Sequence, residues 1–255
     1  MTMPSDRTRV LVLGASGMLG SAAYRVFGED DRFEVIGAAR SEAVRRYLPE
    51  GGRRSLITGV EATAEDSLVR ALAETRPDVV INCIGVIKQL QAANDPLITL
   101  PINALLPHRL AALCRLAGAR LVHISTDCVF SGAKGGYTEE DTPDATDLYG
   151  LSKLLGEVAA PHAITLRTSL IGPELGGGGN GLVGWFLNQS GRVRGFRKAV
   201  FSGLPTVSLA RLMRDVVIPN PSLSGVFHVG AEPINKLDLL TLVRDAWGKE
   251  IEITP

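Results

Sequence analysis

The sequence predicts an α/β fold in which a doubly wound parallel sheet carries a small C-terminal lobe. Short apolar runs, rich in leucine or β-branched residues, alternate with helix-like segments along the first half of the chain. Strands that are apolar on both faces belong to parallel sheets covered by helices on both sides. The chain has 255 residues, 45% of them hydrophobic, which is enough for one large core or for a main domain with an attached lobe.

The expected strands and helices follow one another in a regular order. Strands are expected at Arg9–Leu13, Phe33–Ala38, Ser55–Thr58, Val79–Cys83 and Arg120–Ile124. Helices are expected between them, including Met18–Phe27, Ala64–Thr75 and Asn103–Ala117. This alternation is typical of a doubly wound sheet, in which each strand is followed by a helix that packs back on the sheet.

The pattern changes after a further expected strand at Ile164–Ile171. The segment Gly172–Gly181 is too rich in glycine for regular structure, so we expect either a mobile loop or a flexible connector. Beyond it we expect helices at Leu182–Gln189, Leu209–Val217 and Lys236–Ala246, and strands at Gly225–Val229 and Glu250–Ile253. We therefore divide the chain into a main domain of residues 1–165 and a lobe made mainly of residues 166–255, with segments near 205–230 returning to the main domain.

Composition and charge exclude several classes of protein. Lys plus Arg (27) balance Asp plus Glu (27), so no global field attracts nucleic acid or an anionic membrane. The three cysteines show no CxxC spacing and the four histidines are dispersed, so we propose no disulfide framework and no metal site. The N-terminus is polar and no apolar run looks long enough to span a bilayer. We expect a cytoplasmic protein.

A glycine-rich turn follows the first expected strand. Residues Gly14–Gly20 read GASGMLG and lead into a helix-forming stretch. In this context Gly14 lets the chain turn off the strand, Gly17 leaves room for a pyrophosphate, and Gly20 lets the helix pack close to the sheet. Backbone N–H groups at the helix start favour negative charge. The pattern predicts a dinucleotide site and therefore a Rossmann fold.

The end of the second expected strand indicates which dinucleotide binds. Sites that prefer NAD usually carry an acidic residue there, which accepts a hydrogen bond from the ribose 2′-hydroxyl. This chain has Arg40 instead, and a guanidinium would pair with a 2′-phosphate. The alternative is an exposed loop arginine. We expect NADPH as the cofactor, with NADH as the alternative.

A tyrosine and a lysine stand four residues apart in the segment YGLSKLLGE. On a helix this spacing places Tyr149 and Lys153 on one face, a turn apart. A phenol titrates near pH 10 in water, and a nearby ammonium would lower that pKa. The lysine could also hydrogen-bond the nicotinamide ribose. Such a pair alone is common, and the alternative is the edge of an amphipathic helix.

The strand before this pair ends in hydroxyl groups. The segment Leu121–Gly132 contains Ser125 and Thr126 at the carboxyl end of a buried strand, where ligands of such sheets bind. Thr126 is therefore placed to hydrogen-bond a substrate carbonyl and stabilise the charge that develops on its oxygen. The fourth strand ends in Asn82–Gly85, where small residues allow close approach of the cofactor.

Taken together, these segments resemble the extended short-chain dehydrogenases/reductases, and more narrowly their dTDP-4-dehydrorhamnose reductase branch. The resemblance covers essentially the whole chain and rests on GASGMLG, NCIG, ISTDCVFSG, YGLSKLLGE and TLRTSLIG, in the family's order. It implies that Thr126, Tyr149 and Lys153 are catalytic. It further implies reduction of a 4-keto-6-deoxy nucleotide sugar for polysaccharide biosynthesis, with hydride from the nicotinamide and the proton from Tyr149.

The predicted site follows from these motifs. The residues expected to bind the cofactor are Gly14, Ser16, Gly17, Met18, Leu19, Gly20, Arg40, Cys83, Ile84, Gly85, Tyr149 and Lys153. The residues expected to bind the substrate are Val86, Thr126, Asp127, Phe130, Ser169 and Leu170. The family also has an asparagine near Asn103, with a structural and proton-relay role.

The chain departs from the family pattern in three places. Cys128 stands where related dehydratases carry a glutamate, which argues against water elimination and leaves Asp127 to orient substrate or to make a structural hydrogen bond. Leucine follows Ser169 where the rhamnose-forming enzymes commonly carry a tryptophan; Trp185 and Phe186 could replace that ring or be core residues. The family continues past a position like Pro255, which indicates a trimmed chain, a shorter natural variant or an incomplete site.

Two other functions remain open. An epimerase on the same scaffold would keep its dinucleotide bound and show no net redox turnover. A non-catalytic regulatory subunit, similar to the β subunit of methionine adenosyltransferase, would serve a partner enzyme. The helix Asn103–Ala117 is apolar around most of its circumference, which is consistent with burial or with a helix-packed homodimer.

Overall fold

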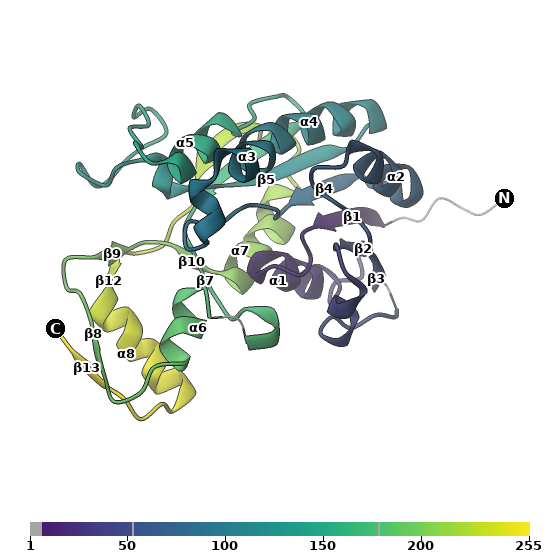
Figure 1. Cartoon of the computed structure of the whole chain (residues 1–255). Coiled ribbons are helices and arrows are strands. Elements are labelled where there is room, and N and C mark those ends of the chain that lie inside the picture. The colour runs from purple at the N-terminus through teal and green to yellow at the C-terminus, as the bar shows by residue number, and fades with distance from the viewer. Residues whose placement is uncertain (1–6, 53, 178) are drawn as a thin grey trace.

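The centre of the molecule is a seven-stranded parallel sheet, seen in a computed structural model that describes residues 7–52, 54–177 and 179–255 (Figure 1). The strand order is β11-β6-β5-β4-β1-β2-β3. The strands span Thr8–Leu13 (β1), Phe33–Ala38 (β2), Arg54–Ile57 (β3), Val79–Asn82 (β4), Arg120–Thr126 (β5), Ala163–Thr168 (β6) and Gly225–His228 (β11). The order reverses between β1 and β4, which is the point where doubly wound sheets bind ligands. The predicted fold class is confirmed.

Helices cover both faces of the sheet because its strands are apolar on both sides. Val10 and Val12 of β1 belong to the same core cluster as α1 (Met18–Phe27) and α7 (Thr206–Leu212), whereas Leu11 and Leu13 point into the opposite cluster. The opposite cluster is covered by α2 and α4. Figure 1 shows α2–α5 above the sheet and α1 and α7 below it. The helices above the sheet span Glu65–Thr75 (α2), Pro96–Thr99 (α3), Leu106–Ala117 (α4) and Leu148–Leu155 (α5).

The segment Pro96–Ala117 is one continuous helix of 22 residues. It begins at α3, passes through a π-helical turn at Leu100–Leu105 and continues as α4, so it starts earlier than the expected Asn103. By length and mean hydropathy (1.4) it could span a membrane, which corrects the expectation that no run is long enough. Its α4 part nevertheless buries Leu106, Leu110 and Cys114 against the sheet, as a core helix does.

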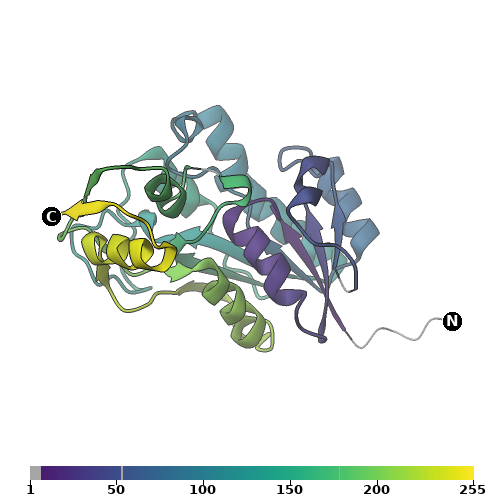
Figure 2. The same ribbon diagram turned by 90° about the horizontal axis from the view of Figure 1, so that it is seen from below.

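The C-terminal lobe has a small core of its own. Its helices α6 (Leu182–Leu187) and α8 (Lys236–Trp247) pack together through residues such as Phe186 and Leu240. Three two-stranded ladders surround them: β7 (Leu170–Ile171) with β10 (Leu204–Pro205), β8 (Arg192–Arg194) with β13 (Glu252–Thr254), and β9 (Val200–Phe201) with β12 (Ile234–Asn235). In Figure 2, seen from below, this lobe lies beside the sheet.

Several expected elements differ in detail. The strand expected at Ile164–Ile171 divides into β6 and β7, which belong to different sheets, so Leu170 leaves the central sheet. The helix expected at Leu209–Val217 is α7 followed by a π-helical turn at Met213–Val217. Short 3₁₀ turns occur at Glu42–Arg46, Gln91–Asn94, Asp127–Val129 and Leu175–Gly177. The last of these lies within the expected glycine loop, whose residue 178 is outside the described residues.

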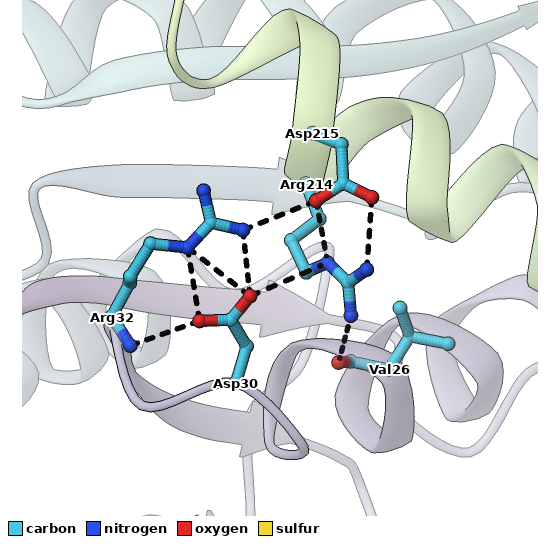
Figure 3. Close-up of polar contacts among 5 residues, drawn as sticks. All are labelled: Val26, Asp30, Arg32, Arg214 and Asp215. Atoms are coloured by element: carbon cyan, nitrogen blue, oxygen red, sulfur yellow. Dashed lines mark hydrogen bonds and ion pairs between the residues drawn. The ribbon is translucent and has the colours of Figure 1, made fainter.

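A cluster of charged side chains fastens the turn after α7 to the start of β2 (Figure 3). The guanidinium of Arg32 pairs with Asp30 at 2.6 Å and with Asp215 at 3.1 Å. Arg214 pairs with Asp215 at 2.8 Å and also donates to the carbonyl of Val26 in α1 at 3.3 Å. The cluster therefore joins residues almost two hundred positions apart in the sequence.

Candidate active site

The glycine turn after β1 has the geometry that its sequence predicts. Gly14 has a φ of +76°, in the left-handed region that favours glycine. A methyl group at Gly20 would lie 2.7 Å from the carbonyl carbon of Gly14, and closer still to its oxygen. Only glycine therefore lets α1 start this close to the turn. Leu19 and Gly20 are buried, whereas Ser16 and Gly17 are exposed.

The start of α1 offers unpaired backbone donors. Its cap residue is Gly17, no side chain caps the helix, and its first turn contains no acidic residue. The N–H of Gly17 donates to the carbonyl of Gly14 at 2.9 Å, and the N–H of Ser21 is the first to reach back to Gly17. The N–H groups of Met18 and Leu19 have no intrahelical acceptor at this position, and they favour an anion.

The loop after β4 lies against this turn. A methyl group at Gly14 would lie 3.2 Å from the carbonyl of Cys83 and 3.1 Å from Ile84. Asn82 stabilises this loop, because its side-chain oxygen accepts a hydrogen bond from the N–H of Ile84 at 3.1 Å. The side chain of Asn103 accepts from the N–H of Val86 at 2.8 Å and donates to its carbonyl at 3.0 Å. Asn103 therefore has the structural role that the resemblance implies.

Arg40 stands two residues beyond the end of β2, as expected. It is exposed, and its backbone carbonyl accepts from the N–H of Gly59 at 3.1 Å. Among the residues that the structure describes, its guanidinium forms no ion pair, so it can bind an external anion at this edge of the sheet.

Tyr149 and Thr126 are brought together by a close approach of α5 to the end of β5. Asp147 caps α5 by accepting from the N–H of Gly150 at 3.0 Å. A methyl group at Gly150 would lie 2.6 Å from the side chain of Ala145 and closer still to the carbonyl oxygen of Cys128. Glycine at this position therefore lets the helix approach the turn after β5. As a result, the hydroxyl of Thr126 lies near the phenol of Tyr149.

The pKa of Tyr149 differs from the sequence-based expectation. Burial raises it from 10.0 to about 12, and the hydrogen bond from Thr126 opposes this only in part. Removing the phenolate from water therefore outweighs the lowering by Thr126, and the neighbouring Asp127 and Asp147 add to the rise.

Lys153 lies one turn further along α5 and is 5% exposed. Its ammonium donates to the carbonyl of Ile124 in β5 at 2.7 Å. Burial lowers the pKa of this lysine from 10.5 to about 8, with Glu157 and Cys83 opposing the shift. Cys83 is also the residue that abuts Gly14, so the lysine and the glycine turn share a neighbour.

Asp127 is tied to the strand beside it. Its carboxylate accepts from the hydroxyl of Ser169 at 2.6 Å and from that of Thr126 at 3.3 Å. The thiol of Cys128 lies 3.6 Å from the same carboxylate. The structure therefore brings three predicted site residues, from the ends of β5 and β6, into one hydrogen-bonded group.

Two residues expected to bind substrate lie apart from this group. The ring of Phe130 is 9% exposed and stacks on Tyr137 at 4.3 Å, with His228 against its edge at 5.5 Å. Leu170 is half-buried in β7, which pairs with β10. Their contact with substrate stays a prediction. Of the two aromatic residues considered as a replacement platform, Phe186 is wholly buried and Trp185 is 39% exposed.

The sequence did not reveal a buried ion pair between Glu157, just after α5, and Arg167 in β6. Glu157 and Arg167 are joined by hydrogen bonds of 2.8 and 2.7 Å, and their side chains are 7% and 8% exposed. Both residues lie within quoted motifs, but spacing alone gives no sign that they meet. Two features of the sequence could have indicated the pair. Glu157 follows Lys153 by four residues, and Arg167 lies inside an apolar strand.

Comparison with protein families gives one match over nearly the whole chain. The model of the family described as "RmlD substrate binding domain" matches residues 8–255. Methionine adenosyltransferase 2 subunit beta of Danio rerio is 30% identical over 257 residues, which cover 94% of this chain and 74% of that protein. The probable low-salt glycan biosynthesis reductase Agl14 of Haloferax volcanii is 34% identical over 165 residues, covering 63% of this chain and 52% of that protein.

Solved structures share the fold. A dTDP-4-dehydrorhamnose reductase from Bacillus anthracis, in complex with NADP, superposes with a TM-score of 0.78 at 22% identity, over 98% of this chain and 84% of that one. An orthologue from Clostridium acetobutylicum gives 0.75 at 26% identity, over 97% and 83%. These similarities support the fold.

Proposed function

The chain belongs to the RmlD substrate binding domain family, and from this we propose that it is an NADPH-dependent reductase of a 4-keto-6-deoxy nucleotide sugar. Relatives and structural neighbours named as reductases support the proposal, one of them in complex with NADP. A cytoplasmic location and a role in polysaccharide biosynthesis belong to the same proposal.

The residues present fit a dinucleotide. The first turn of α1 supplies uncapped N–H groups, Gly17 is exposed, and Arg40 offers a cation at the end of β2. Met18 and Leu19 would bind the pyrophosphate through their backbone N–H groups, Arg40 would bind the 2′-phosphate, and Lys153 would bind the nicotinamide ribose. When bound, the cofactor supplies the hydride.

The proton and the electrostatic stabilisation come from side chains at the end of β5. With a pKa of about 12, Tyr149 stays protonated at neutral pH and can donate its proton to the oxygen of the substrate carbonyl. Thr126 is adjacent and can hydrogen-bond the same oxygen, which lowers the energy of the developing negative charge. Asp127 and Ser169 fix the end of β6 beside Thr126.

One observation carries the proposal: Thr126, Tyr149 and Lys153 meet at the end of β5, next to the loop that abuts the glycine turn. We expect Tyr149→Phe to retain NADPH affinity and to lose about two to four orders of magnitude in turnover, the usual contribution of a positioned general acid. NADPH absorbance with UDP-, dTDP-, GDP- and CDP-linked 4-keto sugars measures this. Unchanged turnover would remove the proposed acid.

A second candidate is a regulatory subunit, favoured by relatives such as methionine adenosyltransferase 2 subunit beta of Xenopus tropicalis, 26% identical over 97% of this chain. A stable complex with a partner enzyme, together with no turnover on any sugar nucleotide in the panel, would favour this function over the reductase.

A further inference from the structure

We propose that Glu157 is a positioning residue for Lys153: through a buried network with Ser125 and Arg167, its carboxylate holds the lysine against β5 in its charged form. This inference rests on the proposed function, because it assigns Glu157 to the site that contains Lys153.

The first observation is that two side chains, four residues apart, bind consecutive residues of β5. The ammonium of Lys153 donates to the carbonyl of Ile124 at 2.7 Å. The carboxylate of Glu157 accepts from the hydroxyl of Ser125 at 2.9 Å. The end of α5 is therefore fastened to the strand at two adjacent points, and Thr126 is the next residue along that strand.

The second observation is that the carboxylate is itself held rigidly. Arg167 binds it through two nitrogens, at 2.8 and 2.7 Å. The guanidinium in turn contacts His228 Nε2 at 3.2 Å and lies 5.2 Å from the centre of the Phe130 ring. A two-point contact of this kind fixes the direction of both groups. The network extends to the exposed Glu139, which accepts from the N–H of His228 at 2.7 Å.

The third observation is the charge around the lysine. Burial lowers the pKa of Lys153 to about 8, and Glu157 makes the largest contribution in the opposite direction. Cys83 and His123 near it are uncharged at neutral pH: burial raises the pKa of Cys83 to about 12 and lowers that of His123 well below its usual value. The guanidinium of Arg167 is bound to the carboxylate of Glu157. Tyr149 on the same helix is protonated as well. Among the described residues, Glu157 is thus the negatively charged group that most favours the protonated form of Lys153.

A buried ion pair contributes little to stability in general, because desolvation of both charges offsets their attraction. The Glu157–Arg167 pair therefore needs a reason other than stability. The position of the pair, between β5, β6 and the end of α5, gives such a reason. Arg167 fixes the carboxylate of Glu157 near the buried ammonium of Lys153.

The test is a direct titration of Lys153, which requires no turnover. The chain has six lysines, so ¹³Cε-lysine labelling gives a simple spectrum, and Lys153→Met identifies the resonance by its loss. We expect a midpoint near 8 in the unmodified protein. In Glu157→Gln we expect the midpoint to fall by about one unit, the low end of the effect of a neighbouring opposite charge.

Three variants control this titration. Glu157→Asp keeps the charge and should restore most of the lost shift. Glu139→Gln removes a carboxylate from the far side of the same network and should leave the midpoint unchanged. If Glu157→Gln fails to fold because Arg167 is left unpaired, the double variant Glu157→Gln/Arg167→Met is compared with Arg167→Met, and its midpoint should be the lower of the two.

An unchanged midpoint in the folded variant that lacks Glu157 overturns the proposal, and so does an equal fall in Glu139→Gln. Turnover gives an independent readout: the alkaline limb of kcat/KM should move to lower pH by the same amount as the midpoint. If the unmodified protein shows no turnover on any sugar nucleotide, the proposed function fails, while the titration still decides the role of Glu157.

Discussion

Replacing Gly150 with alanine tests how the site is assembled. The added methyl group would lie 2.6 Å from the side chain of Ala145, and closer to the carbonyl oxygen of Cys128, whereas ordinary contacts begin at 3.4 Å. One of the two obstacles is backbone, so a side-chain rotation cannot relieve the overlap. Helix α5 would have to move away from the end of β5 by roughly 1 Å.

This displacement has two measurable consequences. Overpacking costs about 1–3 kcal/mol, and the better helix propensity of alanine returns up to about 1 kcal/mol. The net loss is up to about 3 kcal/mol, which lowers Tm by up to about 12 °C for a chain of this size. A misplacement of about 1 Å at a catalytic group can lower turnover about a hundredfold, because Tyr149 moves with the helix.

The matched control is Gly181→Ala. Gly181 precedes α6 with a φ of −81°, and a methyl group there would have its nearest neighbour, Glu174, at 3.7 Å. We expect its stability to change by less than about 1 kcal/mol. Calorimetry and NADPH-coupled turnover measure both variants. Normal stability and turnover in Gly150→Ala would refute the argument that this glycine sets the distance between Tyr149 and Thr126.

Three further predictions concern the cofactor site. Arg40→Asp should weaken NADPH binding by about ten- to a hundredfold, which corresponds to the loss of a hydrogen bond to a charged group. It should affect NADH binding far less. Equal losses for both cofactors in fluorescence titrations would contradict the assignment of Arg40 to the 2′-phosphate. Because the pKa of Lys153 is lowered to about 8, its ammonium is present at pH 7 and is lost as pH rises through 8. NADPH affinity should therefore fall over that interval and become independent of pH in Lys153→Met, and a flat profile in the unmodified protein would contradict this. Gly20→Ala places a methyl group 2.7 Å from the carbonyl carbon of Gly14. It should lower the free energy of unfolding, measured in urea, by about 1–3 kcal/mol. An unchanged free energy of unfolding would mean that α1 can shift freely.

The sequence predicted the sheet and the outline of the site because both depend on local patterns. β1 contains the apolar run Val10–Leu13 and β4 the run Val79–Ile81, which identifies buried parallel strands. Gly14 and Gly20 follow a strand and precede a helix, so their roles could be assigned before any coordinates. Thr126 ends a strand, and the carboxyl ends of parallel strands meet at one edge of the sheet.

Other features depend on contacts between distant residues. Asp127 meets Ser169 across 42 positions, and no spacing rule connects them. The helix was expected to begin only at Asn103, and Pro101, just before that position, would remove a backbone donor from an ordinary α-helix. In the structure Pro101 lies in the π-helical turn at Leu100–Leu105, and the helix continues through it. The raised pKa of Tyr149 was missed because the degree of burial is a property of the folded chain.

The contribution of α7 to the core under β1 limits how this protein can be divided. Leu209, Ala210 and Met213 are wholly buried in the same cluster as Val10 and Val12, although they come from the last quarter of the sequence. A fragment ending at residue 165 would keep α1 but expose the apolar surface that these α7 residues cover, and such a surface promotes aggregation. Split reporters and domain swaps with other reductases should therefore keep residues 206–217 together with the N-terminal half.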